Sequence, residues 1–320
     1  MSDFVHSATT DTLTDGHKAS KASRGDILRR IAKYRLLYVM LAPAILFYIL
    51  FHYVPMYGVR IAFYDYGIFG IKGFIGLENF RYLFASSRFW TAFFNTLIIS
   101  GANLAIAMVL NVGFALLLNE IRRRWFKRFV QTIVYLPHFL SWVVIASIFT
   151  MLLAPQTGIV NAILDQLGLE RVYFLASEKW WRSVFIFINR WKETGWGTII
   201  YLAALTGVDP ELYEAATIDG AGRMRQTWHI TLPALQTTIL IVLIMDLSHV
   251  LNIFQPVFVL YNPIVYHVAD VLGTYTYRVG FEQADYDYAT AIGLFRSVVS
   301  FVLVMGANWL SRLIRKESIL

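Results

Sequence analysis

Residues 209–233 read DPELYEAATIDGAGRMRQTWHITLP and separate two long apolar runs of the chain. Asp209 suits the N-cap of a helix, Pro210 suits the first helical position, and Glu211 complements the helix dipole. Gly220 suits the left-handed conformation that ends many helices. The segment therefore predicts a short helix, a turn at Gly220 and a second short helix that leads into the next apolar run.

The rest of the chain is unusually apolar. Of its 320 residues, 57% are hydrophobic and 15% are charged, and the mean hydropathy is +0.54. Soluble domains average roughly 45 to 50% apolar and about 25% charged residues. A water-soluble domain of this length could not cover its surface with so few charges, so we expect the excess apolar surface to face lipid or other membrane helices.

Long apolar runs predict six membrane-spanning helices, because a helix needs about 20 mostly apolar residues to cross the hydrocarbon core. Four of the runs are plain, and two are interrupted by charged residues. The six spans lie within residues 36–59, 89–119, 129–164, 183–206, 233–269 and 288–310. The predicted fold is an all-α polytopic membrane protein with six transmembrane helices in residues 34–320, preceded by a flexible basic cytoplasmic tail in residues 1–33.

The distribution of Lys and Arg predicts the orientation of these spans. With the N-terminus inside, seventeen of the 28 Lys and Arg residues flank the spans on the cytoplasmic side and eight lie on the opposite side. Cationic loops are retained in the cytoplasm, so both termini and residues 209–233 are predicted to be cytoplasmic. The net charge of +7 follows from this topology, and we expect no nucleic-acid partner.

A spaced motif lies within the polar segment. Glu214-Ala-Ala, three residues, Gly220, nine residues, Ile230, one residue and Leu232-Pro233 follow one another in this order. The chain thereby resembles the permease subunits of type I, binding-protein-dependent ABC importers, in which this loop is a coupling helix seated in a groove of the ATPase. The resemblance implies an ATPase contact through eight residues: Glu214, Ala215, Ala216, Asp219, Gly220, Ile230, Leu232 and Pro233. The alternative is an ordinary amphipathic helix beside the membrane.

The resemblance extends from about residue 27 to the C-terminus and is closest to permeases of oligosaccharide and polysaccharide importers. Its supporting segments are 76–80, 94–96, 191–196, 262–266 and 274–280. It implies the pathway subunit of an ATP-driven importer in the inner membrane, which moves an oligo- or polysaccharide, with an acidic, alginate-like sugar as one expected substrate. The implied partners are two ATPase subunits, a second permease that is identical or homologous, a periplasmic solute-binding protein and the lipid bilayer.

The chain carries no sequence signature of its own chemistry. It has no Gly-x-x-x-x-Gly-Lys-Ser/Thr loop and no cysteine, so nucleotide hydrolysis, with its ATP and Mg²⁺, is expected on the partner ATPases. We expect no catalytic residue, cofactor or metal in this chain. His249 is an unsuitable metal ligand because no second histidine lies at a suitable local spacing.

Ionisable and polar side chains within the spans are the candidates for the solute pathway, because such groups are costly at membrane depth. They are Arg190, Lys192, Glu193, Asp246, His249, Asn252, Gln255 and Arg296. Arg190 and Lys192 offer charge-assisted hydrogen bonds to an anionic sugar such as a uronate. The alternative for them is an ion pair with Glu193 that only stabilises the helix.

The four polar residues from Asp246 to Gln255 predict a stripe on one helix that lines the pore. The alternative is hydrogen bonding between helices.

Two other classes of protein fit parts of the sequence. An ion-coupled secondary sugar transporter would also be a polytopic helical protein, but the internal repeats typical of that class are not visible. A membrane glycosyltransferase is suggested by Asp285-Tyr-Asp287, which has the form used to bind metal-bound nucleotide sugars. The predicted topology puts this motif on the outer face, where nucleotide sugars are not supplied, so a solvated acidic loop is the favoured explanation.

Overall fold

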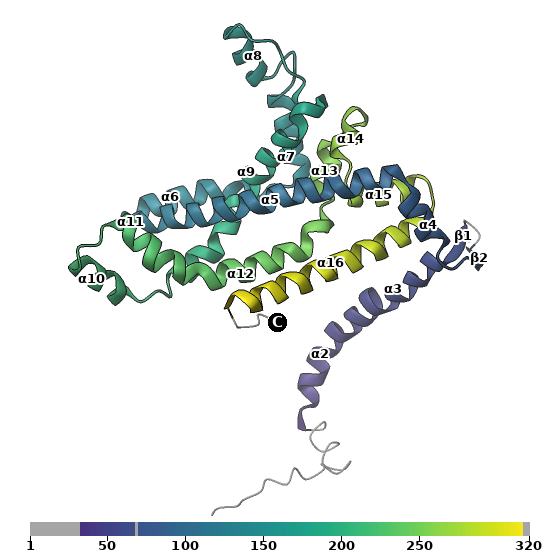
Figure 1. The fold of residues 1–320 in the computed structure, drawn as a ribbon, viewed down its shortest axis with the longest axis horizontal. Helices are drawn as coiled ribbons and strands as arrows, with labels where there is room; N and C mark the ends of the chain where they lie inside the picture. Colours follow the sequence, from purple (N-terminus) through teal and green to yellow (C-terminus); the bar gives the residue numbers. More distant parts are fainter. Residues whose placement is uncertain (1–32, 68–69, 316–320) are drawn as a thin grey trace, which may run out of the picture. The chain divides into compact units, whose positions relative to one another are not determined.

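The computed structural model describes residues 33–67 and 70–315 (Figure 1). The chain divides into two compact units, Met1–Gly58 and Val59–Leu320. In the first unit, α2 (Arg35–Tyr48) continues through a π-helical turn (Ile49–Tyr53) into α3 (Val54–Met56). Its apolar side chains are exposed within the chain, so another surface or lipid must cover them. Apart from Lys33, the predicted tail lies outside the described residues.

The second unit begins with a small hairpin that is tied to the last helix. Strands β1 (Tyr64–Gly67) and β2 (Gly70–Phe74) pair antiparallel, and α4 (Glu78–Ala85) follows. Asn79 of α4 donates hydrogen bonds to the carbonyl of Ala62 (3.1 Å) and to Asp287 Oδ2 (3.5 Å).

The longest helices of the second unit are α5 (Ser87–Glu120), α9 (Glu178–Leu205), α12 (Leu232–His249) and α16 (Tyr286–Arg315) (Figure 1). Ser86 caps α5, because its Oγ accepts the Phe89 N–H at 3.3 Å. By length and composition, the described residues contain four helices able to cross a membrane, or five if one bent pair counts as a single span. The 28 residues of α9 are not among them because charged side chains lower its hydropathy.

The predicted third span, within residues 129–164, is broken. Helix α6 (Arg124–Tyr135) runs into a 3₁₀ segment, Leu136–Phe139, and α7 (Trp142–Leu152) then departs at 101°. The bend arises because Leu140 is extended and Ser141 Oγ caps a new helix at the Val144 N–H. A further short helix, α8 (Ile159–Gln166), projects beyond α7 (Figure 1).

The fifth span is predicted within residues 233–269, and its helix starts earlier in the chain and breaks before residue 269. The predicted second loop helix is present as α11 (Arg223–Gln226), which continues through a π-helical turn (Thr227–Thr231) into α12, so that residues 223–252 form one long helix. After a break at Ile253–Phe254 come α13 (Gln255–Leu260), α14 (Tyr266–Ala269) and α15 (Leu272–Tyr277).

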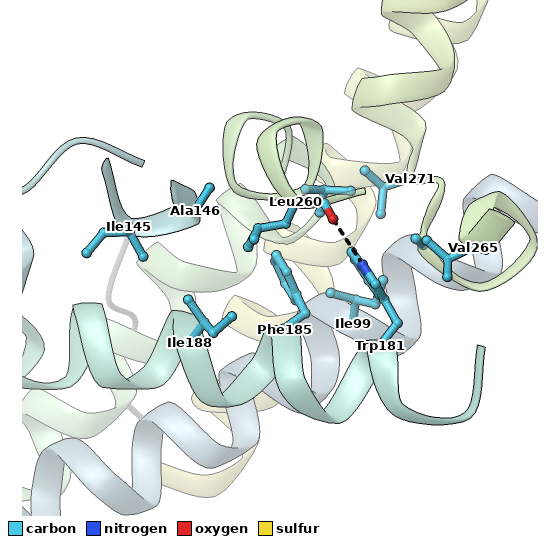
Figure 2. Packing of buried hydrophobic residues seen from close by; sticks show 11 residues of the cluster. Ile99, Ile145, Ala146, Trp181, Phe185, Ile188, Leu260, Val265 and Val271 are labelled. Atoms are coloured by element: carbon cyan, nitrogen blue, oxygen red, sulfur yellow. Dashed lines mark hydrogen bonds between the residues drawn. The ribbon is translucent and has the colours of Figure 1, made fainter. Parts of the chain in front are cut away.

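The main buried core joins α9 to α5, α7 and the short helices after the break. Phe185 and Trp181 stack at 5.0 Å between ring centroids, and Trp181 Nε1 donates to the Leu260 carbonyl at 3.3 Å (Figure 2). Ile99 of α5 and Ile145 of α7 complete the contacts around them. This packing holds α9 at the centre of the unit and orients its charged side chains.

Candidate functional site

The polar segment folds around the capping residues that its sequence predicts. Helix α10 (Pro210–Ile218) begins at Asp209, whose Oδ1 accepts the Glu211 N–H at 3.0 Å. It ends in a Schellman turn, in which the Ala221 N–H bonds the Ala216 carbonyl (2.8 Å) and Gly220 has a φ of 74°. The predictions for Asp209, Pro210 and Gly220 are confirmed.

Side chains anchor this segment to the long helices. Arg223 pairs with Glu120 at the end of α5, and Tyr213 OH lies 3.1 Å from Thr231 Oγ1. Gln226 Nε2 donates to Thr217 Oγ1 at 3.0 Å. These contacts join α10 to the helical segment that leads into α12, and join the start of that segment to the end of α5.

The motif residues differ in their exposure to solvent. Glu214, Ala215, Asp219 and Gly220 are exposed, whereas Ala216, Ile230 and Leu232 are half-buried and Pro233 is exposed at the start of α12. Apolar side chains of the same segment are also exposed: Leu212, Ile218, Met224 and Trp228, with Ile218 87% exposed. An apolar surface of this kind next to an acidic residue is suited to a protein partner.

A cavity of about 480 Å³, which we call the central cavity, lies between α5, α9 and α12. Of the predicted pathway residues, Arg190, Glu193, Asp246 and His249 line it. Arg190 Nε donates to Asn103 Oδ1 at 3.1 Å, and its Nη2 also bonds Asn189 Oδ1. The cavity therefore brings both signs of charge together with amide groups.

Lys192 does not line the central cavity. It is 4% exposed, its Nζ donates to the His138 carbonyl at 2.7 Å, and Glu193 Oε1 lies 3.3 Å away. Glu193 Oε2 is 2.8 Å from His138 Nδ1, and the His138 ring stacks on Trp196 at 4.5 Å. Lys192 thus adopts the paired arrangement with Glu193 that the sequence left open as the alternative.

The predicted polar stripe is wrong as geometry, because the helix breaks within it. Asp246 and His249 belong to α12, whereas Asn252 lies in a 3₁₀ turn and Gln255 starts α13. Neither Asn252 nor Gln255 lines the central cavity, and Arg296 of α16 lines a different one.

The sequence reasoning missed several residues of the central cavity: Ser100, Asn103, Asn111, Trp142, Asn189 and Trp196. Within the part of the chain that the structure describes, Ser100 Oγ and Asn111 Oδ1 are buried without a hydrogen-bond partner. Buried polar atoms are usually hydrogen-bonded, so these two oxygens are exceptions among the residues that line the cavity. Asparagines inside the apolar run 89–119 were the available signal.

The Asp285-Tyr-Asp287 motif serves the start of α16. Asp285 Oδ1 accepts the Tyr288 N–H at 3.3 Å, and Asp287 Oδ2 accepts from Tyr66 N (3.4 Å) and Asn79. Burial, and then the hydrogen bond that protonated Asp285 shares with Asp287, raise the pKa of Asp285 to about 6. Among the described residues, no group of three or more His, Cys, Asp or Glu side chains is placed to hold a metal ion.

Known proteins are similar to this chain in both sequence and fold. The family described as binding-protein-dependent transport system inner membrane component matches residues 106–317. The polygalacturonan/rhamnogalacturonan transport system permease protein YteP of Bacillus subtilis (strain 168) is 44% identical over 303 residues, 93% of this chain and 94% of that protein. Protein LplB of the same organism is 42% identical over 88% of this chain and 90% of its own length.

Two solved structures are also similar. A bacterial ABC transporter involved in the import of the acidic polysaccharide alginate contains a chain with a TM-score of 0.85 and 42% identity, and the match covers 90% of this chain and 99% of that one. The second structure is a bacterial alginate ABC transporter in complex with an alginate pentasaccharide-bound periplasmic protein, with the same TM-score and identity and coverage of 91% and 99%. The chain belongs to the binding-protein-dependent transport system inner membrane components, the permease subunits of ABC importers.

Proposed function

We propose that the chain forms part of the transmembrane pathway of an ATP-driven importer for an oligo- or polysaccharide, with an acidic sugar as the favoured substrate. The observation that carries the sugar pathway is the central cavity, which combines a guanidinium, amides and two tryptophans. Sugars present hydroxyl groups and apolar ring faces, and these groups match that lining. A relative named for polygalacturonan/rhamnogalacturonan transport and a similar transporter that imports the acidic polysaccharide alginate support an acidic substrate.

The proposed topology has six spans with both termini in the cytoplasm. In it, α9 is the fourth span, because its charged residues face the central cavity or pair with each other, and the bent α6–α7 segment is the third. The excess of Lys and Arg on one side supports the orientation. Residues 209–233 then lie in the cytoplasm.

In the proposed mechanism, α10 transmits the motion of an ATPase to the spans. The ATPase contacts the first part of the motif: Glu214, Ala215, Ala216, Asp219 and Gly220. The second part of the motif connects this contact surface to α12 through Ile230, Leu232 and Pro233. The ion pair between Arg223 and Glu120 gives the same motion a path into α5. Tilting of α5 and α12 changes access to the cavity that they enclose.

The proposed assembly contains two ATPases, a second permease and a periplasmic binding protein. ATP and Mg²⁺ are bound by the ATPases, and this chain contributes no catalytic residue, cofactor or metal. The binding-protein complex of the similar alginate transporter supports the extracytoplasmic partner. The exposed apolar surface of α2 supports burial against lipid or another subunit.

The test is reconstitution of this chain with its ATPases, second permease and binding protein in proteoliposomes that contain ATP. We expect labelled acidic oligosaccharide to accumulate only with ATP and binding protein present. Accumulation driven by an ion gradient without ATP would instead favour a secondary transporter, and would refute the proposal.

A further inference from the structure

A second cavity, of about 870 Å³, lies beside the break after α12. Adjacent residues on the chain face the two cavities, because Ile253 lines the central cavity and Phe254 lines the second one. Gly273 makes this arrangement possible: a Cβ at that position would lie 2.6 Å from the Ile253 carbonyl oxygen. The second cavity is thus a neighbour of the central cavity across one turn of irregular backbone.

The lining of the second cavity is aromatic with a single charge. Arg296 is the one charged residue among the described residues that line it. Five aromatic residues surround the same space: Tyr66, Phe254, Tyr277, Phe281 and Tyr286. Arg296 lies ten residues after Tyr286 on α16, about 15 Å along the helix, so the cavity extends from the start of α16 inward.

Arg296 has no hydrogen bond, ion pair or ring contact with any residue in the described part of the chain. Arg190 and Arg278, which line other cavities, are paired: Arg190 bonds Asn103, and Arg278 bonds Asp270. A guanidinium at membrane depth is costly, so an unpartnered one points to an anionic ligand. Its planar fork matches a carboxylate.

We propose that the second cavity binds a uronate residue of the transported sugar chain, with Arg296 on its carboxylate and the aromatic rings on its apolar faces. This inference rests on the proposed function. It assigns recognition of the acidic group to the second cavity because the central cavity also contains Asp246, which repels a carboxylate. In the proposed topology the second cavity is the outer of the two and receives the sugar first.

The test compares uptake of an acidic oligosaccharide with uptake of its carboxyl-reduced, neutral counterpart of equal length by the reconstituted importer. We expect Arg296→Gln to raise the half-saturating concentration of the acidic chain about tenfold or more, because a charge-assisted hydrogen bond is lost. The half-saturating concentration of the neutral chain should change by less than about twofold. Arg296→Lys should give a smaller effect. Arg81→Gln removes an exposed arginine and should change the half-saturating concentration of neither sugar.

A second measurement does not depend on replacing Arg296. Because the chain has no natural cysteine, Thr290→Cys provides a single thiol in the wall of the second cavity, and Ser297→Cys provides an exposed control beside it. We expect the acidic oligosaccharide, but not the neutral one, to slow labelling of the first thiol only.

Equal effects of Arg296→Gln on both sugars, or protection of Thr290→Cys by anionic lipid instead of sugar, would overturn the inference while uptake by the unmodified importer still supports the proposed function. Absence of any ATP-dependent uptake by the unmodified importer would refute the proposed function itself.

Discussion

Lys192 Nζ lies 3.3 Å from Glu193 Oε1, so the carboxylate in the wall of the central cavity is balanced by a buried ammonium behind it. Arg190, two residues earlier on α9, faces the cavity itself. Two cations that are almost adjacent in sequence therefore have different surroundings, and their replacement should have different consequences.

Arg190→Gln should weaken uptake of acidic sugars more than uptake of neutral sugars, because it leaves Asp246 as an uncompensated negative charge in the cavity. Lys192→Met should instead lower the amount of folded protein and reduce uptake of both sugars alike, since it leaves the His138 carbonyl without its donor and removes the ammonium beside Glu193, a loss of about 1 to 3 kcal/mol in the free energy of unfolding. Initial uptake rates and the thermal midpoint of the purified complex check the two outcomes. Identical behaviour of the two variants would contradict this division of roles.

The same contrast shows what sequence patterns can predict. Asp209 and Gly220 were predictable because caps depend on residues within a few positions of each other. The break at Ile253–Phe254 was not, since the apolar run continues through it and only Pro256 hinted at irregular backbone. The orientation of Arg190 toward the cavity and the pairing of Lys192 depend on contacts with α5, α7 and the 3₁₀ segment at His138. The positions of these distant elements cannot be read from a local sequence pattern.

Glu214 can be tested against Glu211, a second exposed glutamate on α10. Glu214→Lys should abolish copurification of the ATPase, because it reverses a charge at the centre of the proposed contact. Glu211→Lys should weaken only the first turn of α10, by about 0.3 to 1 kcal/mol through the helix dipole. Immunoblots of membranes measure insertion, and the ATPase to permease ratio after purification measures association. Full copurification with Glu214→Lys would argue against the contact.

Gly220 and Gly222 form a matched pair in the same turn. Both have open space where a Cβ would stand, but φ is 74° at Gly220 and −69° at Gly222. Gly220→Ala should destabilise the native turn by about 1 to 2 kcal/mol, because the left-handed conformation strains an L-residue. Since the ATPase binds this turn in the proposed contact, its affinity should fall about 5- to 30-fold. Gly222→Ala should have a smaller effect. Titration of the reconstituted permease with ATPase measures both affinities, and equal losses would mean that the turn geometry is unimportant.

We predict that the stability of the folded protein depends on pH through Asp285, which lies beside Asp287 at the start of α16. Burial and the neighbouring Asp287 raise the pKa of Asp285 from 3.8 to about 6, so the folded protein holds this proton more tightly than the unfolded chain does. The associated stability is present in full below about pH 4 and is lost as pH rises through about 6. Asp285→Asn keeps an oxygen that accepts the Tyr288 N–H but cannot ionise, so it should flatten the fall in thermal midpoint between pH 4.5 and about 7. Parallel melting curves for the two proteins across this range would show that Asp285 ionises equally in both states.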